Sequence, residues 1–243
     1  ATLTSALRQA REWRRTEDNR IQGGITIYME GATYAFHEPV FIRPEDSGTK
    51  ESPTIIRSVG DEKVILSGGI SIKGWKKQGK VWVADVPAFN GRPLDFRQLW
   101  VNGKKAVRAR DVEDFEKMNR ICSVDEKNEI LYVPAVSIRR LIDNKGNLKA
   151  KYAEMVLHQM WCVANLRIRS VEVQGDSAAI RFHQPESRIQ FEHPWPHPMV
   201  TTDGHNSAFY LTNARELQDV PGEWYHDIDA RKVYYYPREG EKM

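Results

Sequence analysis

The most unusual chemical group in this sequence is the proline-rich run His193-Pro194-Trp195-Pro196-His197-Pro198. Histidines at this spacing place two metal ligands on one face of a helix. Prolines at every second position forbid that helix, because proline lacks a backbone N–H and its ring clashes with the preceding turn. The run therefore predicts no metal site. It predicts a rigid, extended loop in which His193, Trp195 and His197 contact a sugar, or equally a proline-rich wall packed on the edge of a β domain.

A second group, His158-Gln159-Met160-Trp161, lies at the end of a predicted strand. Imidazole and amide groups form hydrogen bonds with sugar hydroxyls, and a flat indole stacks on a sugar ring. His158 and Trp161 are therefore candidate substrate-binding residues. The polar side chains of this group could instead satisfy one another and the nearby backbone inside the domain, which is the commoner fate of interior polar residues.

Two further groups contain residue types that recognition or catalysis uses. Arg108 and Arg110 could hold the carboxylate of an acidic sugar through paired hydrogen bonds, although pairing with the acidic residues at positions 111, 113 and 114 is the simpler interpretation. Asp203, His205 and Ser207 are the residue types of a hydrolytic triad. No Gly-x-Ser-x-Gly nucleophile elbow accompanies them, so we assign them no catalytic role.

The composition excludes several classes of function. The 243 residues carry a net charge of +3, with lysine and arginine spread along the chain, so no basic patch indicates a nucleic-acid partner. No apolar run approaches the roughly 20 residues that span a bilayer. A glycine-rich phosphate loop and paired Cys-x-x-Cys ligands are both absent, so we expect no cofactor. Cys122 and Cys162 could form one bridge or remain free, and our expectation is two buried, apolar thiols.

Residues 1–71 are predicted to form one short helix followed by short strands. Leu3, Leu7 and Ala10 recur at helical spacing within residues 3–15, and strands are predicted at 25–29, 40–42, 54–56 and 64–66. The open end of a stack of β coils exposes unpaired backbone groups and an apolar core, which an amphipathic helix can cover. The helix is therefore predicted to cap a β-helix. The turn Asp46-Ser47-Gly48-Thr49 is predicted to bond its own backbone rather than a ligand.

From about residue 72 the predicted strands become longer, more aromatic and hairpin-like. The Asn102-Gly103 pair suits a type I′ hairpin turn. A strand, a polar turn and a second strand of the form Ile/Val-x-Tyr-x-Pro occur twice, at 121–134 and 224–237. Further strands are predicted near 154–160, 166–173, 178–183 and 208–212. Residues 72–243 are therefore predicted to form an antiparallel β-sandwich-like domain.

Several short motifs follow one another in an order that is more specific than any one of them. In chain order they are Glu30-Gly31-Ala32-Thr33-Tyr34, Asp46-Ser47-Gly48-Thr49, Ser67-Gly68-Gly69, Gly74-Trp75, Arg97 to Gly103, Ala106 to Arg110, Glu223-Trp224-Tyr225 and Tyr235 to Glu241. The ordered set resembles bacterial right-handed parallel β-helix proteins related to glycoside hydrolase family 141.

The resemblance implies an all-β fold in two parts. Residues 1–71 would hold the capping helix and the first β-helix coils, and residues 72–243 would be a β-sandwich-like insertion that returns toward the β-helix. It implies a secreted or periplasmic glycosidase that hydrolyses a complex polysaccharide or glycan with two carboxylates. Both acids are expected on later β-helix coils beyond residue 243, and those coils of the same protein would be the structural partner of residues 1–243. We therefore assign no catalytic residue here and expect residues 1–243 alone to be inactive.

Two other functions stay open at this point. Trp161, Trp195 and Trp224 favour a non-catalytic carbohydrate-binding module if their rings are exposed. A polysaccharide lyase is also compatible with a β-helix, but lyases often use Ca²⁺, and no compact acidic Ca²⁺ loop is visible in the sequence. The lyase therefore ranks below the other two functions.

Overall fold

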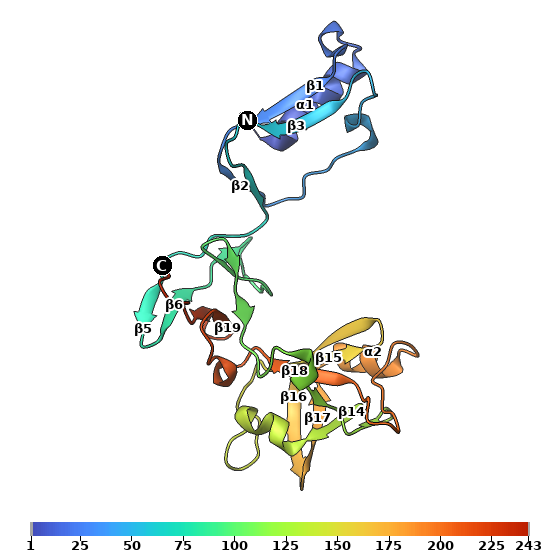
Figure 1. Cartoon of the computed structure of the whole chain (residues 1–243), viewed down its shortest axis with the longest axis vertical. Helices are drawn as coiled ribbons and strands as arrows, with labels where there is room; N and C mark the ends of the chain where they lie inside the picture. The colour runs from blue at the N-terminus through green and yellow to red at the C-terminus, as the bar shows by residue number, and fades with distance from the viewer. Residues whose placement is uncertain (1, 243) are drawn as a thin grey trace. The chain divides into compact units, whose positions relative to one another are not determined.

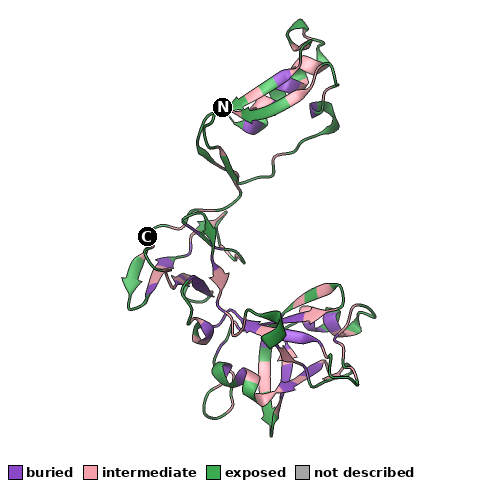
Figure 2. Ribbon diagram, in the orientation of Figure 1, coloured by how far each residue is buried: buried purple, intermediate pink, exposed green. Residues whose placement is uncertain are grey.

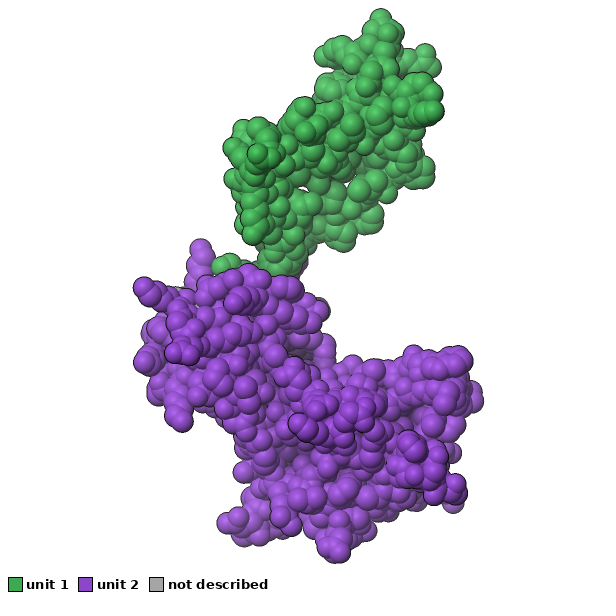
Figure 3. Space-filling view, viewed as in Figure 1, with its two compact units in different colours: residues 1–71 green, residues 72–243 purple. Residues whose placement is uncertain are grey.

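The computed structural model describes residues 2–242. The chain divides into two compact units, residues 1–71 and 72–243 (Figure 3). No helix among the described residues is long and apolar enough to cross a membrane. Over the described residues most of the regular structure is β-strand, so the fold is all-β in class (Figure 1).

Unit 1 begins with a helix and continues with four strands. They are α1 (Leu3–Arg15), β1 (Ile25–Met29), β2 (Thr33–Ala35), β3 (Thr54–Ser58) and β4 (Ile65–Ser67). The predicted helix and the strand at 25–29 are confirmed. The strand predicted at 40–42 is wrong, because this segment has no partner strand and the Phe41 carbonyl accepts a hydrogen bond from Arg11 instead.

The strands of unit 1 pair in parallel, each with the strand about 30 residues further along the chain. β1 pairs with β3, with Ile25 opposite Thr54, and β2 pairs with β4, with Thr33 opposite Ile65. The chain therefore forms two successive turns, the first with β1 and β2 and the second with β3 and β4, and each strand of the second turn lies beside its counterpart in the first. A period of this length is within the 20–45 residues typical of stacked repeats.

Helix α1 is attached to these strands by apolar and charged contacts. Thr2 and Ser5 form a capping box at its start, and Leu3 and Leu7 share a small core with Met29. On the polar side, Arg11 Nε donates to Asp46 Oδ1 at 2.7 Å. The Asp46 turn is therefore part of the helix attachment, which agrees with its predicted structural role.

Among the described residues of unit 2 there are sixteen strands and one short α-helix. They are β5 (Lys76–Gln78), β6 (Val81–Asp85), β7 (Ala88–Phe89), β8 (Arg92–Pro93), β9 (Trp100–Val101), β10 (Lys104–Lys105), β11 (Val107–Arg108), β12 (Asn119–Arg120), β13 (Ser123–Asp125), β14 (Ile130–Pro134), β15 (Glu154–Gln159), β16 (Cys162–Gln174), β17 (Ser177–Phe182), α2 (Glu186–Glu192), β18 (Ala208–Thr212), β19 (Glu223–Asp227) and β20 (Lys232–Tyr235). Helix α2 was not predicted.

The larger sheet of unit 2 closes on itself. Its order is β12-β18-β15-β16-β17-β14-β13, and its two ends, β12 and β13, are consecutive in the chain. The N–H of Ile121 donates to the Ser207 carbonyl on the β18 side, and that of Cys122 donates to the Tyr132 carbonyl on β14. The long strand β16 shifts register between Ile168 and Ser170, which lets it pair with β15 at one end and β17 at the other.

A smaller sheet, β11-β19-β20-β6-β5, has its own apolar cluster. Trp224, Val233 and Tyr235 are buried on one face of it, whereas Tyr225 belongs to the core inside the closed sheet. The predicted β-sandwich is therefore corrected to a closed antiparallel sheet around one core and a smaller sheet that contacts it from outside. Figure 2 shows the buried segments concentrated in the closed sheet.

The cysteines differ from the expectation of two buried thiols. Cys122 is exposed and Cys162 is half-buried, and both are free. Cys122 lies where the chain changes from pairing with β18 to pairing with β14. Cys162 is the first residue of β16 and follows an exposed hairpin turn. Neither position is inside the apolar core.

Candidate functional site

The hairpin between β15 and β16 positions the predicted residues His158 and Trp161. Gln159 pairs with Cys162 across the hairpin, so Met160 and Trp161 form its tip. Trp161 has a φ of +67° and leaves 89% of its surface exposed. A positive φ is uncommon for a large side chain, and an indole held in water loses the stabilisation that burial gives. Both features fit a ring held out for a ligand.

A cavity of about 270 Å³ lies at the base of this hairpin. Its lining comes from the hairpin, from β12 with the segment that precedes it, and from the start of β18 with the segment that precedes it: Phe115, Arg120, His158, Gln159, Met160, Met199, His205, Asn206, Ser207 and Ala208. The antiparallel pairing of β12 with β18, with Arg120 opposite Ala208, brings the last two segments together. Phe115 and Arg120 were missed by the sequence interpretation, because only this long-range pairing places them near His158.

Several polar atoms around this cavity have no protein partner. Nε2 of His158 and both Nε2 and Oε1 of Gln159 are buried without a hydrogen bond. The His158 ring packs edge-on against Phe115, at 5.4 Å between ring centres. Burial lowers the pKa of His158, and the charge of Arg120 lowers it further, so the imidazole is neutral at neutral pH and can donate and accept. Unpaired buried polar groups require a partner such as water or ligand, and hydroxyl groups suit this set.

The second group of predicted residues lies in the segment after α2. Trp195 is 45% exposed and packs edge-on against His197, at 5.7 Å between ring centres. His193 Nδ1 accepts a hydrogen bond from the Trp195 N–H, and His197 Nδ1 lies 3.2 Å from the Pro194 carbonyl. The two histidine rings are therefore held by the backbone of the loop, and the Trp195 ring packs against one of them. Within residues 2–242, no hydrogen bond or ring contact joins them to His158 or Trp161.

The other residues considered in the sequence have structural partners. Asp203 pairs with His205 at 3.2 Å, and its neighbours Thr201 and His205 lower the pKa of Asp203 to about 2. Ser207 Oγ instead accepts from the Met199 N–H. No hydrogen bond links His205 to Ser207 among the described residues, so no triad forms. Nor does any group of three or more His, Cys, Asp or Glu side chains in residues 2–242 have the geometry to hold a metal ion.

The buried carboxylates are also occupied. Asp46 accepts from Arg11 and from the Arg43 N–H, and Glu154 accepts from Arg97 and Arg108. Glu223 accepts from the backbone N–H groups at 110, 219 and 220, although loss of hydration raises its pKa. Glycoside hydrolysis needs two carboxyl groups that face a shared open space. The buried acids of the described residues are committed to other contacts.

Comparisons with known proteins identify the family to which this chain belongs. The sequence model of the GH141 insertion domain matches residues 79–238, so this chain belongs to that family. A solved structure named "Glycoside hydrolase" is 89% identical to the chain and superimposes on all of it with a TM-score of 0.91. The chain spans 40% of the length of that structure. A search of curated proteins gave no match.

Proposed function

We propose that this chain is the N-terminal portion of a glycoside hydrolase that acts on a complex polysaccharide or glycan. The observation that carries the proposal is the 89% identity, over the whole chain, to a longer protein named as a glycoside hydrolase. We further propose that the catalytic carboxylates lie beyond residue 243 and that the substrate is met outside the cytoplasm. The commitment of Asp46, Glu154 and Glu223 to local contacts supports the first of these points.

The parallel pairs of unit 1 support a right-handed parallel β-helix as the scaffold of the whole enzyme. The strands β3 and β4 are each paired on one side within the described residues. Ile55, Ile56 and Leu66 on these strands are exposed. A further coil stacked on β3 and β4 would satisfy their outer backbone groups and cover these side chains. In this proposal residues 72–243 are the insertion between early coils.

The test compares hydrolysis of a panel of aryl glycosides and polysaccharides by residues 1–243 and by the natural full-length protein. We expect turnover by the full-length protein and none by residues 1–243. Efficient hydrolysis by the 243-residue chain would show that the catalytic acids are misplaced. Absence of hydrolysis by the full-length protein, across substrates of every common sugar, would contradict the activity.

A carbohydrate-binding role for unit 2 is the second candidate, and Trp161 is the observation that favours it. The Trp161→Ala variant is expected to weaken binding of a glycan-array ligand by about fivefold or more, because a ring stacked on an aromatic side chain contributes about 1–3 kcal/mol in nucleic-acid-binding proteins. Trp100→Ala is the matched control, since Trp100 is also a hairpin residue and is 60% exposed. Equal loss of binding in both variants, or in neither, would contradict a site at Trp161.

A further inference from the structure

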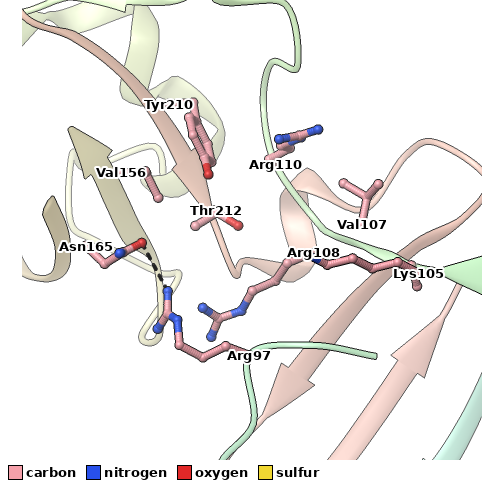
Figure 4. A pocket seen from close by; sticks show the side chains of 10 residues that line it. Arg97, Lys105, Val107, Arg108, Arg110, Val156, Asn165, Tyr210 and Thr212 are labelled. Carbon is pink, nitrogen blue, oxygen red and sulfur yellow. Dashed lines mark hydrogen bonds between the residues drawn. The ribbon is translucent and has the colours of Figure 1, made fainter. Parts of the chain in front are cut away.

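A second cavity in unit 2, of about 350 Å³, has only cationic groups among the charged residues that line it (Figure 4). The cationic groups are those of Arg97, Lys105, Arg108 and Arg110. The cavity shares no lining residue with the hairpin cavity at His158. It therefore forms a separate site on the same unit.

A buried carboxylate fixes two of these arginines. Glu154 is 5% exposed, and its Oε2 accepts from both Arg97 Nη2, at 2.6 Å, and Arg108 Nη1, at 2.9 Å. Its Oε1 accepts from Arg97 Nη1 at 3.2 Å. Arg97 also bonds to Asn165 Oδ1, at 3.3 Å. Figure 4 shows the guanidinium groups of Arg97 and Arg108 directed toward the same space. Their geometry is set before any ligand binds, which lowers the entropic cost of binding.

Several donors of this cavity have no partner among the described residues. Arg108 Nη2, Arg110 Nη1 and Lys105 Nζ form no hydrogen bond. The Nε atoms of Arg108 and Arg110 are buried and unpaired. Loss of hydration lowers the pKa of Arg108, Glu154 opposes that shift, and the like charge of Arg97 adds to it. An anion in the cavity would stabilise the charged form of Arg108.

The uncharged part of the lining fits a sugar ring better than a bare anion. Asn165, Tyr210 and Thr212 supply amide and hydroxyl groups, and Val107 and Val156 supply apolar contact. In Figure 4 the Tyr210 hydroxyl is directed toward Thr212, across the space from Arg108. The volume lies within the range of about 300–1,000 Å³ that is usual for small-molecule sites.

We propose that this cavity binds an acidic saccharide, with the carboxylate of a uronate residue held by Arg97, Arg108 and Lys105. Guanidinium groups hold carboxylates through paired, charge-assisted hydrogen bonds. The proposal rests on the proposed function only in taking the ligand to be a saccharide. It assigns the insertion unit a preference for acidic polysaccharide, whatever bond the whole enzyme cleaves.

The test measures binding of galacturonic acid trimer and of its methyl ester to residues 1–243 by isothermal titration calorimetry. The ester keeps the sugar and removes the charge, so we expect its dissociation constant to be at least tenfold higher. Lys105→Gln and Arg97→Gln are expected to weaken trimer binding about tenfold each, the effect of losing one hydrogen bond to a charged group. Lys77→Gln and Arg169→Gln, at exposed positions that do not line the cavity, are the matched controls and should bind the trimer normally.

The outcomes separate this proposal from the proposed function. Equal binding of acid and ester, or trimer binding that Arg97→Gln and Lys105→Gln leave unchanged, would overturn the uronate site while the glycan site at Trp161 stands. Absence of any trimer binding by the unmodified chain would overturn it as well. If neutral glycans also fail to bind at the hairpin, the results would contradict the carbohydrate-binding role of unit 2 as well as the uronate site. Hydrolysis by the full-length protein is measured independently of all these results.

Discussion

At the scale of single residues, Glu154 shows how a buried charge organises this protein. Its carboxylate is almost fully removed from water and is compensated by two arginines that come from distant parts of the chain. Burying an ion pair costs much of its Coulomb attraction in lost hydration. The arrangement is therefore better explained by the position it gives to Arg97 and Arg108 than by a large net stabilisation.

Removal of the Glu154 charge is expected to destabilise unit 2 strongly. In Glu154→Gln the Arg108 side chain, 11% exposed, stays buried without a counter-ion, and loss of one partner of a buried pair costs about 3–5 kcal/mol. Urea unfolding followed by fluorescence gives the free energy of unfolding. The control is Glu113→Gln, whose carboxylate is 78% exposed beside Arg110 and should change stability by less than about 1 kcal/mol. Similar losses in both variants would contradict this account.

The same residues show what sequence can and cannot predict about a site. Arg110 pairs with Glu113, one of the nearby acids considered for it. The prediction that Arg108 pairs with the same nearby acids is wrong. Strand pairing brings Glu154, 46 positions away in the chain, to Arg108 instead. His158 and Trp161 were found because their residue types are unusual at a strand end. Phe115 and Arg120 carry no such local signal.

At the scale of elements, local rules predict most of what the chain forms. Helix α1 and the Asn102-Gly103 turn follow from spacing and residue type, and both turn residues have the expected positive φ, 49° and 75°. The strand predicted at 40–42 does not form, because no other strand among the described residues lies beside this segment to pair with it. Closure of the larger sheet could not be predicted, because it depends on one strand segment that pairs with β18 at its start and with β14 at its end.

The Gly48 turn gives a prediction at this scale. Gly48 has a φ of +71°, and a Cβ added there would lie 2.2 Å from the Ser52 carbonyl oxygen. Gly48→Ala is therefore expected to cost more than about 2 kcal/mol, since the left-handed conformation alone costs about 1–2 kcal/mol. Amide hydrogen exchange of β1 and β3 measures the loss.

Two glycines of the same unit separate the causes. Gly60 has a φ of +53° with nothing within 4 Å of an added Cβ, so Gly60→Ala reports the conformational cost alone. Gly68→Ala meets neither a positive φ nor a close atom and should leave exchange unchanged. Exchange in Gly48→Ala equal to that in Gly60→Ala would show that the close approach to Ser52 has no consequence.

At the scale of the whole molecule, unit 2 has a pH-dependent stability. Asp111 accepts the Leu211 N–H at 2.8 Å, and burial raises its pKa from 3.8 to about 6. Because the folded state prefers the protonated acid, this stabilisation is complete below about pH 4 and is lost as the pH rises through 6. The free energy of unfolding should fall by up to about 3 kcal/mol over that interval.

Asp111→Asn is expected to remove this fall, since an amide keeps the Leu211 contact and does not titrate. At pH 7 the variant should be more stable than the unmodified chain. Urea unfolding at several pH values, followed by tryptophan fluorescence, measures the difference, because six of the seven tryptophans belong to residues 72–243. Parallel stability curves for the two proteins between pH 4 and 7 would contradict the role given to Asp111.

The closed sheet has a consequence for how the purified chain behaves on storage. A ring of strands has no outermost member, so its backbone offers no template onto which a second molecule can add. The parallel strands β3 and β4 each keep an unpaired side among the described residues and display Ile55 and Leu66 to solvent. Aggregates of this chain should therefore grow through strands outside the ring, first through β3 and β4 because these display apolar side chains, with the ring still intact inside them.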